Sequence, residues 1–187
     1  MSPLPPLGLK SFAPAYTLEG NYYSIATVTV PSGGAANVTF AGVPQTYKHL
    51  ELRIFAKDEG TGTYNSGGKI RFNGDSGSNY SNHELYGLGS GTPSSDVPSG
   101  SNPWNGMNFV SGSSNFGANI VSILDYTSTS KNKTIRHIGG VDNNGSGAIL
   151  LESGAWLNTS AINSISMIFD GGQDFAEFSH FALYGVK

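Results

Sequence analysis

The stretch Lys69–Gly87, KIRFNGDSGSNYSNHELYG, contains the pattern on which the fold prediction depends. Its first four residues alternate polar and apolar side chains, which is the period of a half-buried β-strand. Asn73-Gly74-Asp75 then ends that strand with residues that tolerate a left-handed backbone, and His83–Tyr86 resumes an extended pattern. The stretch therefore predicts two strands joined by a glycine-rich turn, a unit from which the rest of the chain is also built.

The clearest alternation in the chain lies at His49–Lys57, where every second residue is aliphatic, beginning with Leu50. A strand of a β-sandwich needs this division, with one face in the core and the other outside. Turn clusters separate further runs at spacings typical of an all-β sandwich or barrel. The predicted strands are Tyr22–Val30, Asn37–Phe40, His49–Lys57, 69–73, 82–88, Asn108–Ser111, Asn119–Tyr126, Thr134–Val141, Ala148–Glu152, Ile162–Phe169 and Phe175–Val186.

Composition supports one packed domain and argues against several functional classes. The chain has 187 residues, no cysteine, 12% charged residues and a net charge of −3, so thiol chemistry is absent and nucleic-acid binding is disfavoured. No segment approaches the ~20 apolar residues of a membrane span. The N-terminus has neither the basic region nor the apolar run of a secretory signal, so we expect synthesis in a cytoplasm.

Residues 1–15 differ from the rest, because prolines there exclude regular helix and favour an extended path. One interpretation is a frayed terminus. The other, which we favour, is an arm that docks on a neighbouring protein, since four large apolar side chains are more than a solvated tail carries. The predicted docking residues are Pro3, Leu4, Pro5, Pro6, Leu7, Leu9 and Phe12. Residues 16–187 would then form a single β-sandwich domain.

The longest irregular segment is predicted at 87–106, which shows no periodicity. Such a length is uncommon in a compact domain unless the loop is functional or mobile. It is either a surface excursion whose tryptophan covers the edge of the core or a contact loop, because tryptophan is an effective interface anchor. The candidate contact residues are Pro93, Asp96, Pro98, Pro103 and Trp104.

No constellation for catalysis or metal binding stands out. The four histidines lie dozens of residues apart, without the spacing of a metal site. Asn73, Asp75 and Asn79 could supply oxygen ligands for calcium, but no acidic residue closes that loop and the same residues suit a plain turn. The carboxylates that a glycosidase would need are scattered. We therefore expect neither an enzyme nor a cofactor.

Aromatic residues allow a different function. They could form a platform on which sugar rings stack, or they could fill the core of the sandwich, where tyrosine and phenylalanine suit pleated surfaces. The candidates are Tyr22, Tyr23, Tyr64, Tyr80, Tyr86 and Trp104.

Several separated blocks of the chain resemble, in order, a family of tailed-phage virion proteins. They are IRFNGD at 70–75, GSNYS at 77–81, LYG at 85–87, FAGVPQTYKHL at 40–50, WLNTSAINSI at 156–165 and ALYG at 182–185. The resemblance covers residues 16–187 and implies an antiparallel β-sandwich, specifically a jelly roll, that is a structural part of a virus particle.

Two positions on a virion fit such a domain. On the head it would be a decoration or cement protein that binds the capsid exterior and stabilises it. On the tail it would be a fibre or baseplate module that binds host surface carbohydrate. We favour the head, because the sequence contains no coiled coil or fibre shaft. We also expect a homo-oligomer, specifically a trimer, since viral sandwiches commonly cover their exposed edges by associating around a symmetry axis.

Overall fold

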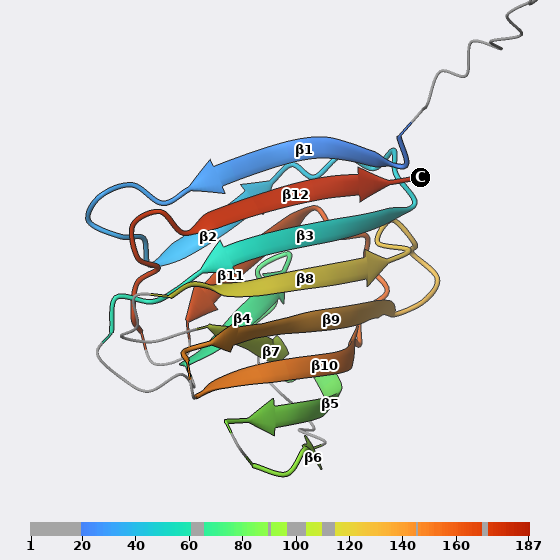
Figure 1. Ribbon diagram of the computed structural model, residues 1–187. Helices are drawn as coiled ribbons and strands as arrows, with labels where there is room; N and C mark the ends of the chain where they lie inside the picture. The colour runs from blue at the N-terminus through green and yellow to red at the C-terminus, as the bar shows by residue number, and fades with distance from the viewer. Residues whose placement is uncertain are drawn as a thin grey trace, which may run out of the picture.

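The computed structural model describes residues 20–60, 66–89, 91–96, 104–109, 115–144, 146–169 and 172–187, with the backbone alone at 66, 96 and 104–109. In these residues the chain forms twelve strands in two antiparallel sheets (Figure 1). The antiparallel β-sandwich predicted from the sequence is confirmed. The strands are β1 (Tyr22–Thr29), β2 (Asn37–Ala41), β3 (His49–Ala56), β4 (Ser66–Phe72), β5 (Tyr80–Leu88), β6 (Ser94–Asp96), β7 (Trp104–Phe109), β8 (Gly117–Leu124), β9 (Lys133–Asp142), β10 (Gly147–Trp156), β11 (Ser164–Phe169) and β12 (His180–Val186).

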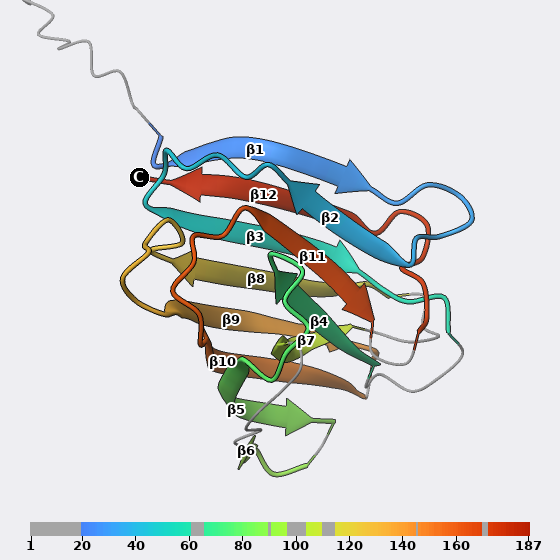
Figure 2. The ribbon, with the colours of Figure 1, turned by 180° about the vertical axis from the view of Figure 1, so that it is seen from behind.

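The two sheets differ in size. The larger has eight strands in the order β1-β12-β3-β8-β9-β10-β5-β6, and the smaller has four in the order β2-β11-β4-β7. Figure 2 shows the smaller sheet lying across one face of the larger one, with β6 at the far edge of the larger sheet. The opposite face of the larger sheet, called the outer face here, is turned toward the viewer in Figure 1. Nothing in the described residues covers it.

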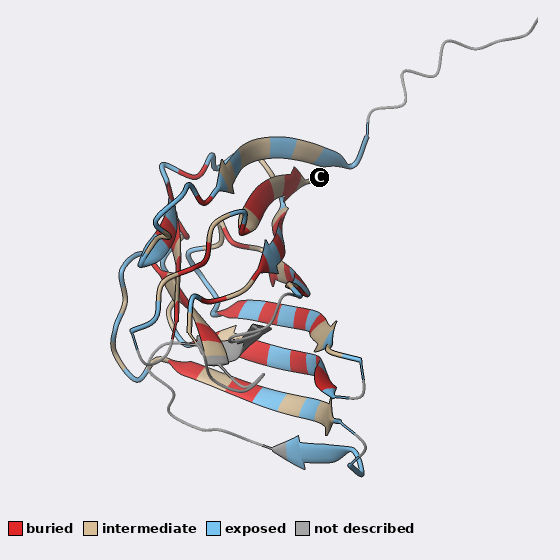
Figure 3. Ribbon diagram, turned by 60° about the vertical axis from the view of Figure 1, so that its left-hand side comes forward, coloured by how far each residue is buried: buried red, intermediate tan, exposed pale blue. Residues whose placement is uncertain are grey.

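The core lies between the sheets. On β3 the predicted alternation is confirmed, because Leu50, Leu52, Ile54 and Ala56 are all buried. Figure 3 shows similar alternating bands of buried and exposed residues along other strands of the larger sheet. Aromatic rings fill much of the interior, in two groups that consist of Phe72, Tyr80 and Trp156 and of Phe169, Phe175 and Phe181.

The turn predicted after Phe72 also forms. Asn73 and Gly74 adopt positive φ angles of 54° and 70°, and the Asp75 backbone N–H donates to the Phe72 carbonyl at 2.9 Å. β5 starts at Tyr80 and pairs with β10, which belongs to the other sheet. The turn therefore carries the chain from one layer of the sandwich to the other.

Several predicted boundaries were wrong. The segment 87–106 is not one irregular loop, since β5 runs to Leu88, β6 forms a short edge strand and β7 begins at Trp104. The strand predicted at Asn108–Ser111 is therefore displaced toward the N-terminus. The last strand starts at His180 and not at Phe175, because Phe175 makes isolated bridges to Ala35 and Asp58 in place of a continuous ladder. No described residue lies in a helix that could span a membrane.

Candidate interaction surface

A row of large aliphatic side chains crosses the outer face of the larger sheet. Ile120 on β8 pairs with Ile138 on β9, which pairs with Leu151 on β10, which in turn pairs with Leu85 on β5. These four residues are 43–56% exposed. Side chains at directly opposed positions of a sheet stand on the same face. The row is therefore a continuous apolar stripe over four adjacent strands.

A second row of side chains lies beside the first, displaced by two residues on each strand. The residues in the middle of this row are small. It runs from Phe55 through Ala118 and Gly140 to Ile149, which is 65% exposed. Phe116 stacks on Phe55 with ring centroids 4.7 Å apart and extends that wall. The small residues form the floor of an open hollow of about 830 Å³ between the aromatic wall and Ile149.

The inner face of the same strands encloses a polar cluster, next to buried apolar residues such as Ile135 and Leu150. His137 forms two hydrogen bonds. Its Nδ1 lies 2.6 Å from Glu152 Oε2, and its Nε2 lies 2.8 Å from Asn119 Oδ1. Asn82 Nδ2 donates to the other Glu152 oxygen at 3.1 Å. These side chains are buried, and β7 of the smaller sheet packs across β9, β10 and β5 on this side (Figure 2). On β9, β10 and β5 polar groups are therefore enclosed while aliphatic groups are exposed.

Burial determines the protonation states of these hydrogen-bonded side chains. It lowers the pKa of His137 to about 4, and Glu84 opposes that fall more weakly. It raises the pKa of Glu152 to about 7, although hydrogen bonds with Asn82 and Glu84 oppose the rise. Below neutral pH the proton therefore lies on Glu152, which donates to His137 Nδ1, while the Nε2–H donates to Asn119. These side chains therefore form an uncharged hydrogen-bond network inside the sandwich.

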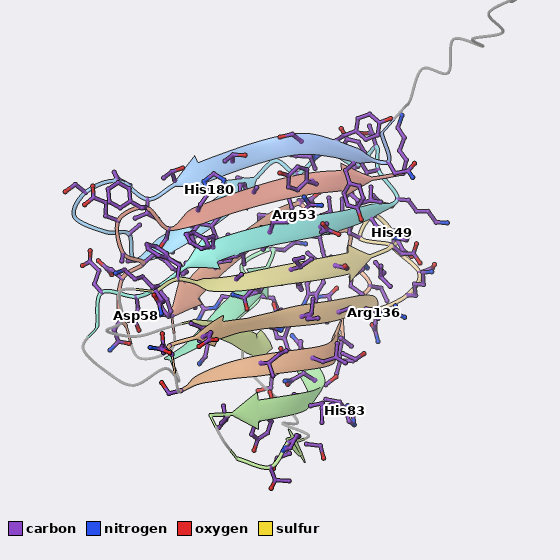
Figure 4. All side chains as sticks on the ribbon, viewed as in Figure 1. His49, Arg53, Asp58, His83, Arg136 and His180 are labelled. Atoms are coloured by element: carbon purple, nitrogen blue, oxygen red, sulfur yellow. The ribbon has the colours of Figure 1, made fainter. Side chains whose placement is uncertain are left out.

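The opposite end of the outer face, on β1, β12 and β3, is aromatic and charged. The guanidinium of Arg53 lies 5.3 Å from the ring centroid of Tyr22 and 4.8 Å from that of Tyr184. Arg53 Nε also donates to Glu51 Oε1 at 2.8 Å, which raises the pKa of Arg53. Figure 4 shows Arg53 and Arg136 on this face of the sheet, well separated from each other.

The proposed aromatic platform does not assemble from the described residues. Tyr80 is fully buried, and its hydroxyl accepts from the Phe72 N–H and donates to the Asp75 carbonyl, both at 3.1 Å. Tyr22 lies against Arg53, and Tyr23 stacks on Tyr47 with centroids 5.6 Å apart. Tyr86 faces inward on β5, away from Tyr22. The Trp104 side chain and Tyr64 lie outside the described residues.

The oxygens proposed as calcium ligands already accept hydrogen bonds. Asp75 accepts from the Gly77 backbone N–H, from Asn79 and from the Trp156 indole N–H, at distances of 2.8–3.1 Å. Asn73 Oδ1 accepts from the backbone N–H groups of 163 and 164. The loop is thus a hydrogen-bonded turn. Among the described residues, no three His, Asp or Glu side chains lie together as a metal site requires.

The carboxylates considered for glycoside hydrolysis yield one close pair. Glu84 and Glu152 lie directly opposite each other on β5 and β10, on the inner face. The Glu152 side chain is completely buried with His137, so its carboxylate is closed off from solvent. The other acidic side chains are distributed over loops and strand ends.

The predicted contact residues are only partly visible. The docking arm, with Pro3, Leu4, Pro5, Pro6, Leu7, Leu9 and Phe12, lies outside the described residues, as do Pro98 and Pro103. Pro93 is exposed beside β6, while Asp96 and Trp104 are placed by their backbone in β6 and β7.

The two apolar rows of the outer face were not predicted from the sequence. Their signal is the alternation of His137 with Ile138 and of Glu152 with Leu151, but alternation does not tell which face is covered.

Comparison of the chain with protein-family models, with curated proteins and with solved structures found no match. The surface must therefore be interpreted from its own chemistry.

Proposed function

We propose that the protein is a non-enzymatic structural component of a tailed-phage virion and acts by burying surface against other proteins. One observation carries the proposal: the outer face of the larger sheet presents six large apolar side chains that are 43–65% exposed, namely Phe55, Leu85, Ile120, Ile138, Ile149 and Leu151. Contiguous apolar patches of this kind are uncommon on monomeric soluble proteins and mark interaction sites.

The strand order supports a jelly-roll origin, which the sequence resemblance implies. A jelly roll is a sandwich of eight strands in two sheets. Here four strands of the larger sheet, β1-β12-β3-β8, have the same relative order along the chain as β2-β11-β4-β7 of the smaller sheet. Along the chain the two sets alternate, except that β4 and β7 of the smaller sheet follow one another. The remaining strands, β9, β10, β5 and β6, extend the larger sheet from β8.

These added strands carry most of the apolar side chains of the outer face. Ile138, Ile149, Leu151 and Leu85 belong to them, and only Phe55 and Ile120 belong to the eight-strand part. Strands that serve the fold alone would place their aliphatic residues inward. The extension buries Ile135 and Leu150 but also directs large aliphatic residues outward, which fits a surface made for a protein partner.

We place the protein on the head, as a decoration or cement protein whose N-terminal arm, residues 1–15, reaches a capsid subunit. The alternative position is the tail, where a fibre or baseplate module would bind host carbohydrate. No observation on the described residues favours the tail. Tyr80 is buried and Tyr86 is partly buried, while Tyr22 lies against Arg53 and Tyr23 against Tyr47, so these tyrosines form no common platform. Assembly in the host cytoplasm would bring the protein into the particle.

The test is to purify phage particles from infected cells that produce this chain, separate heads from tails and probe each fraction with an antibody against it. We expect the chain in the head fraction, released intact by mild denaturation and without activity on host polysaccharide. Its absence from purified particles would overturn the proposal, and its recovery with tails would support the alternative position.

A further inference from the structure

The outer face of β9 is complementary to itself. Four positions of β9 lie on this face, in the order Arg136, Ile138, Gly140 and Asp142. They are a cation, a large aliphatic residue, a residue without a side chain and an anion. Gly139, at an inner-face position, is the midpoint of this series. Residues at equal distances on its two sides are opposite in kind: cation against anion, and large against small. Arg136 and Asp142 are exposed, and neither forms an ion pair with another described residue.

Neighbouring strands repeat the pattern about the same line. On β8 the large Ile120 and the small Ala118 lie on either side of Asn119, which pairs with Gly139. On β5 Leu85 and Gly87 lie on either side of Tyr86, which is in register with Gly139 through Leu150. On β10 both positions, Leu151 and Ile149, are large. The midpoints therefore form one straight line across the sheet.

From this pattern we infer that a second copy of the chain packs its outer face on this one, around a two-fold axis that lies above the outer face, parallel to the line through Asn119, Gly139 and Leu150. The inference rests on the proposed function, in which this face is buried between proteins. A two-fold axis in that direction reverses the strands of the second copy. Ile138 of each copy then faces Gly140 of the other, and Ile120 faces Ala118.

The same rotation brings opposite charges together. Arg136 of each copy faces Asp142 of the other, so two ion pairs close the central strand contact. Within one copy these residues lie six positions apart on a straight strand, about 20 Å at ~3.3 Å per residue, and cannot meet. Packed sheets lie ~10 Å apart and align within ~30°, so the large-to-small match is tightest over the central strands β8 and β9.

A second copy explains the face better than an unrelated partner does. A two-fold contact uses the same patch twice, so a large residue is best matched by a small one of the same patch, as on β8, β9 and β5, and a cation by an anion. An unrelated protein would impose no antisymmetry about one line. This arrangement is a dimer contact, and it differs from the three-fold association expected from the sequence.

The first test is sedimentation of the full-length chain and of charge-reversed variants. We expect a dimer for the parent, at least tenfold weaker association for R136D and for D142R, and recovery to within a few-fold of the parent in the variant R136D/D142R. The control K48D changes an exposed charge away from this face and should leave association unchanged. Thermal unfolding of each variant establishes that it is folded.

The second test uses two aliphatic residues of nearly equal exposure. Ile138 on the outer face is 52% exposed, and Leu157, which follows β10, is 50% exposed. I138Q should weaken dimerisation at least tenfold, while L157Q should not. A monomeric or trimeric parent, or a dimer that is insensitive to I138Q and to single charge reversal, would overturn the inference. None of these results bears on whether the chain is found in phage heads, so the two proposals can fail separately.

Discussion

Trp156 donates its indole N–H to the carboxylate of Asp75 at 2.8 Å, a bond that joins residues 81 positions apart. Asp75 lies in the turn after β4 of the smaller sheet, and Trp156 ends β10 of the larger one. The Asp75 carboxylate also accepts from the Gly77 N–H and the Asn79 amide. One turn residue therefore holds its own loop and ties it to the other layer of the sandwich.

Substituting Asp75→Asn should destabilise the protein by about 1–3 kcal/mol, because an amide nitrogen replaces one oxygen and leaves a donor without its acceptor. Urea unfolding followed by tryptophan fluorescence measures the change. Asp174→Asn is the matched control, since no side-chain hydrogen bond of Asp174 is present among the described residues, and it should stay within ~0.5 kcal/mol of the parent. Equal stability of the two variants would contradict the role given to Asp75.

The buried pair on β9 and β10 predicts two pH dependences of opposite sign. Because burial raises the pKa of Glu152 to about 7, its contribution to stability is complete at pH values below its unfolded pKa and is lost as the pH rises through 7. Because burial lowers the pKa of His137 to about 4, its contribution is complete at pH values above the unfolded pKa and is lost as the pH falls through 4. In the parent these slopes oppose each other between the two unfolded pKa values.

Single isosteric variants should separate the two effects. His137→Gln leaves Glu152 buried, so stability should fall as the pH rises from ~4.5 to ~7, with a slope of up to ~1.4 kcal/mol per pH unit. Glu152→Gln leaves His137 buried, so stability should fall as the pH decreases from ~6.5 to ~4. Chemical unfolding at several pH values measures both slopes. Slopes of the same sign in the two variants would show that the assigned protonation states are wrong.

Tyr47 covers Gly185 so closely that a Cβ at position 185 would overlap its ring. Gly185→Ala should therefore cost about 1–3 kcal/mol through overpacking. The cost should shrink when Tyr47→Ala is already present, which a double-mutant cycle measures as a coupling energy. Gly20→Ala is the control, because its added Cβ would meet only the Tyr22 carbonyl oxygen, at an ordinary contact distance of 3.7 Å, and should change stability little.

Removal of residues 1–15 tests the docking arm. The truncated chain should stay folded and keep its oligomeric state, because the described contacts of the sandwich begin after this segment. It should nevertheless fail to bind particles that have been stripped of the native protein, as measured by co-sedimentation. Decoration as complete as that of the full chain would mean that the arm is a frayed terminus and that the sandwich alone provides the anchor.

The alternation of β3 shows what the sequence determined by itself. Leu50, Leu52, Ile54 and Ala56 are apolar at every second position, and a strand with that period has only one face that can be buried. Turn residues such as Asn73-Gly74 likewise mark the ends of strands, because few other residues accept a positive φ. Fold class and most strand positions follow from such local patterns.

Only the tertiary structure decided which face of β9 and β10 is covered. His137 alternates with Ile138, and Glu152 alternates with Leu151, so the period is clear, but each of the two faces carries large apolar side chains and hydrophobicity alone does not choose between them. That choice depends on β5, β7 and β8, which supply Asn82, the covering strand and Asn119 from distant parts of the chain. A local pattern defines two faces, but only the strands that pair with it and pack on it determine which one meets solvent or a partner.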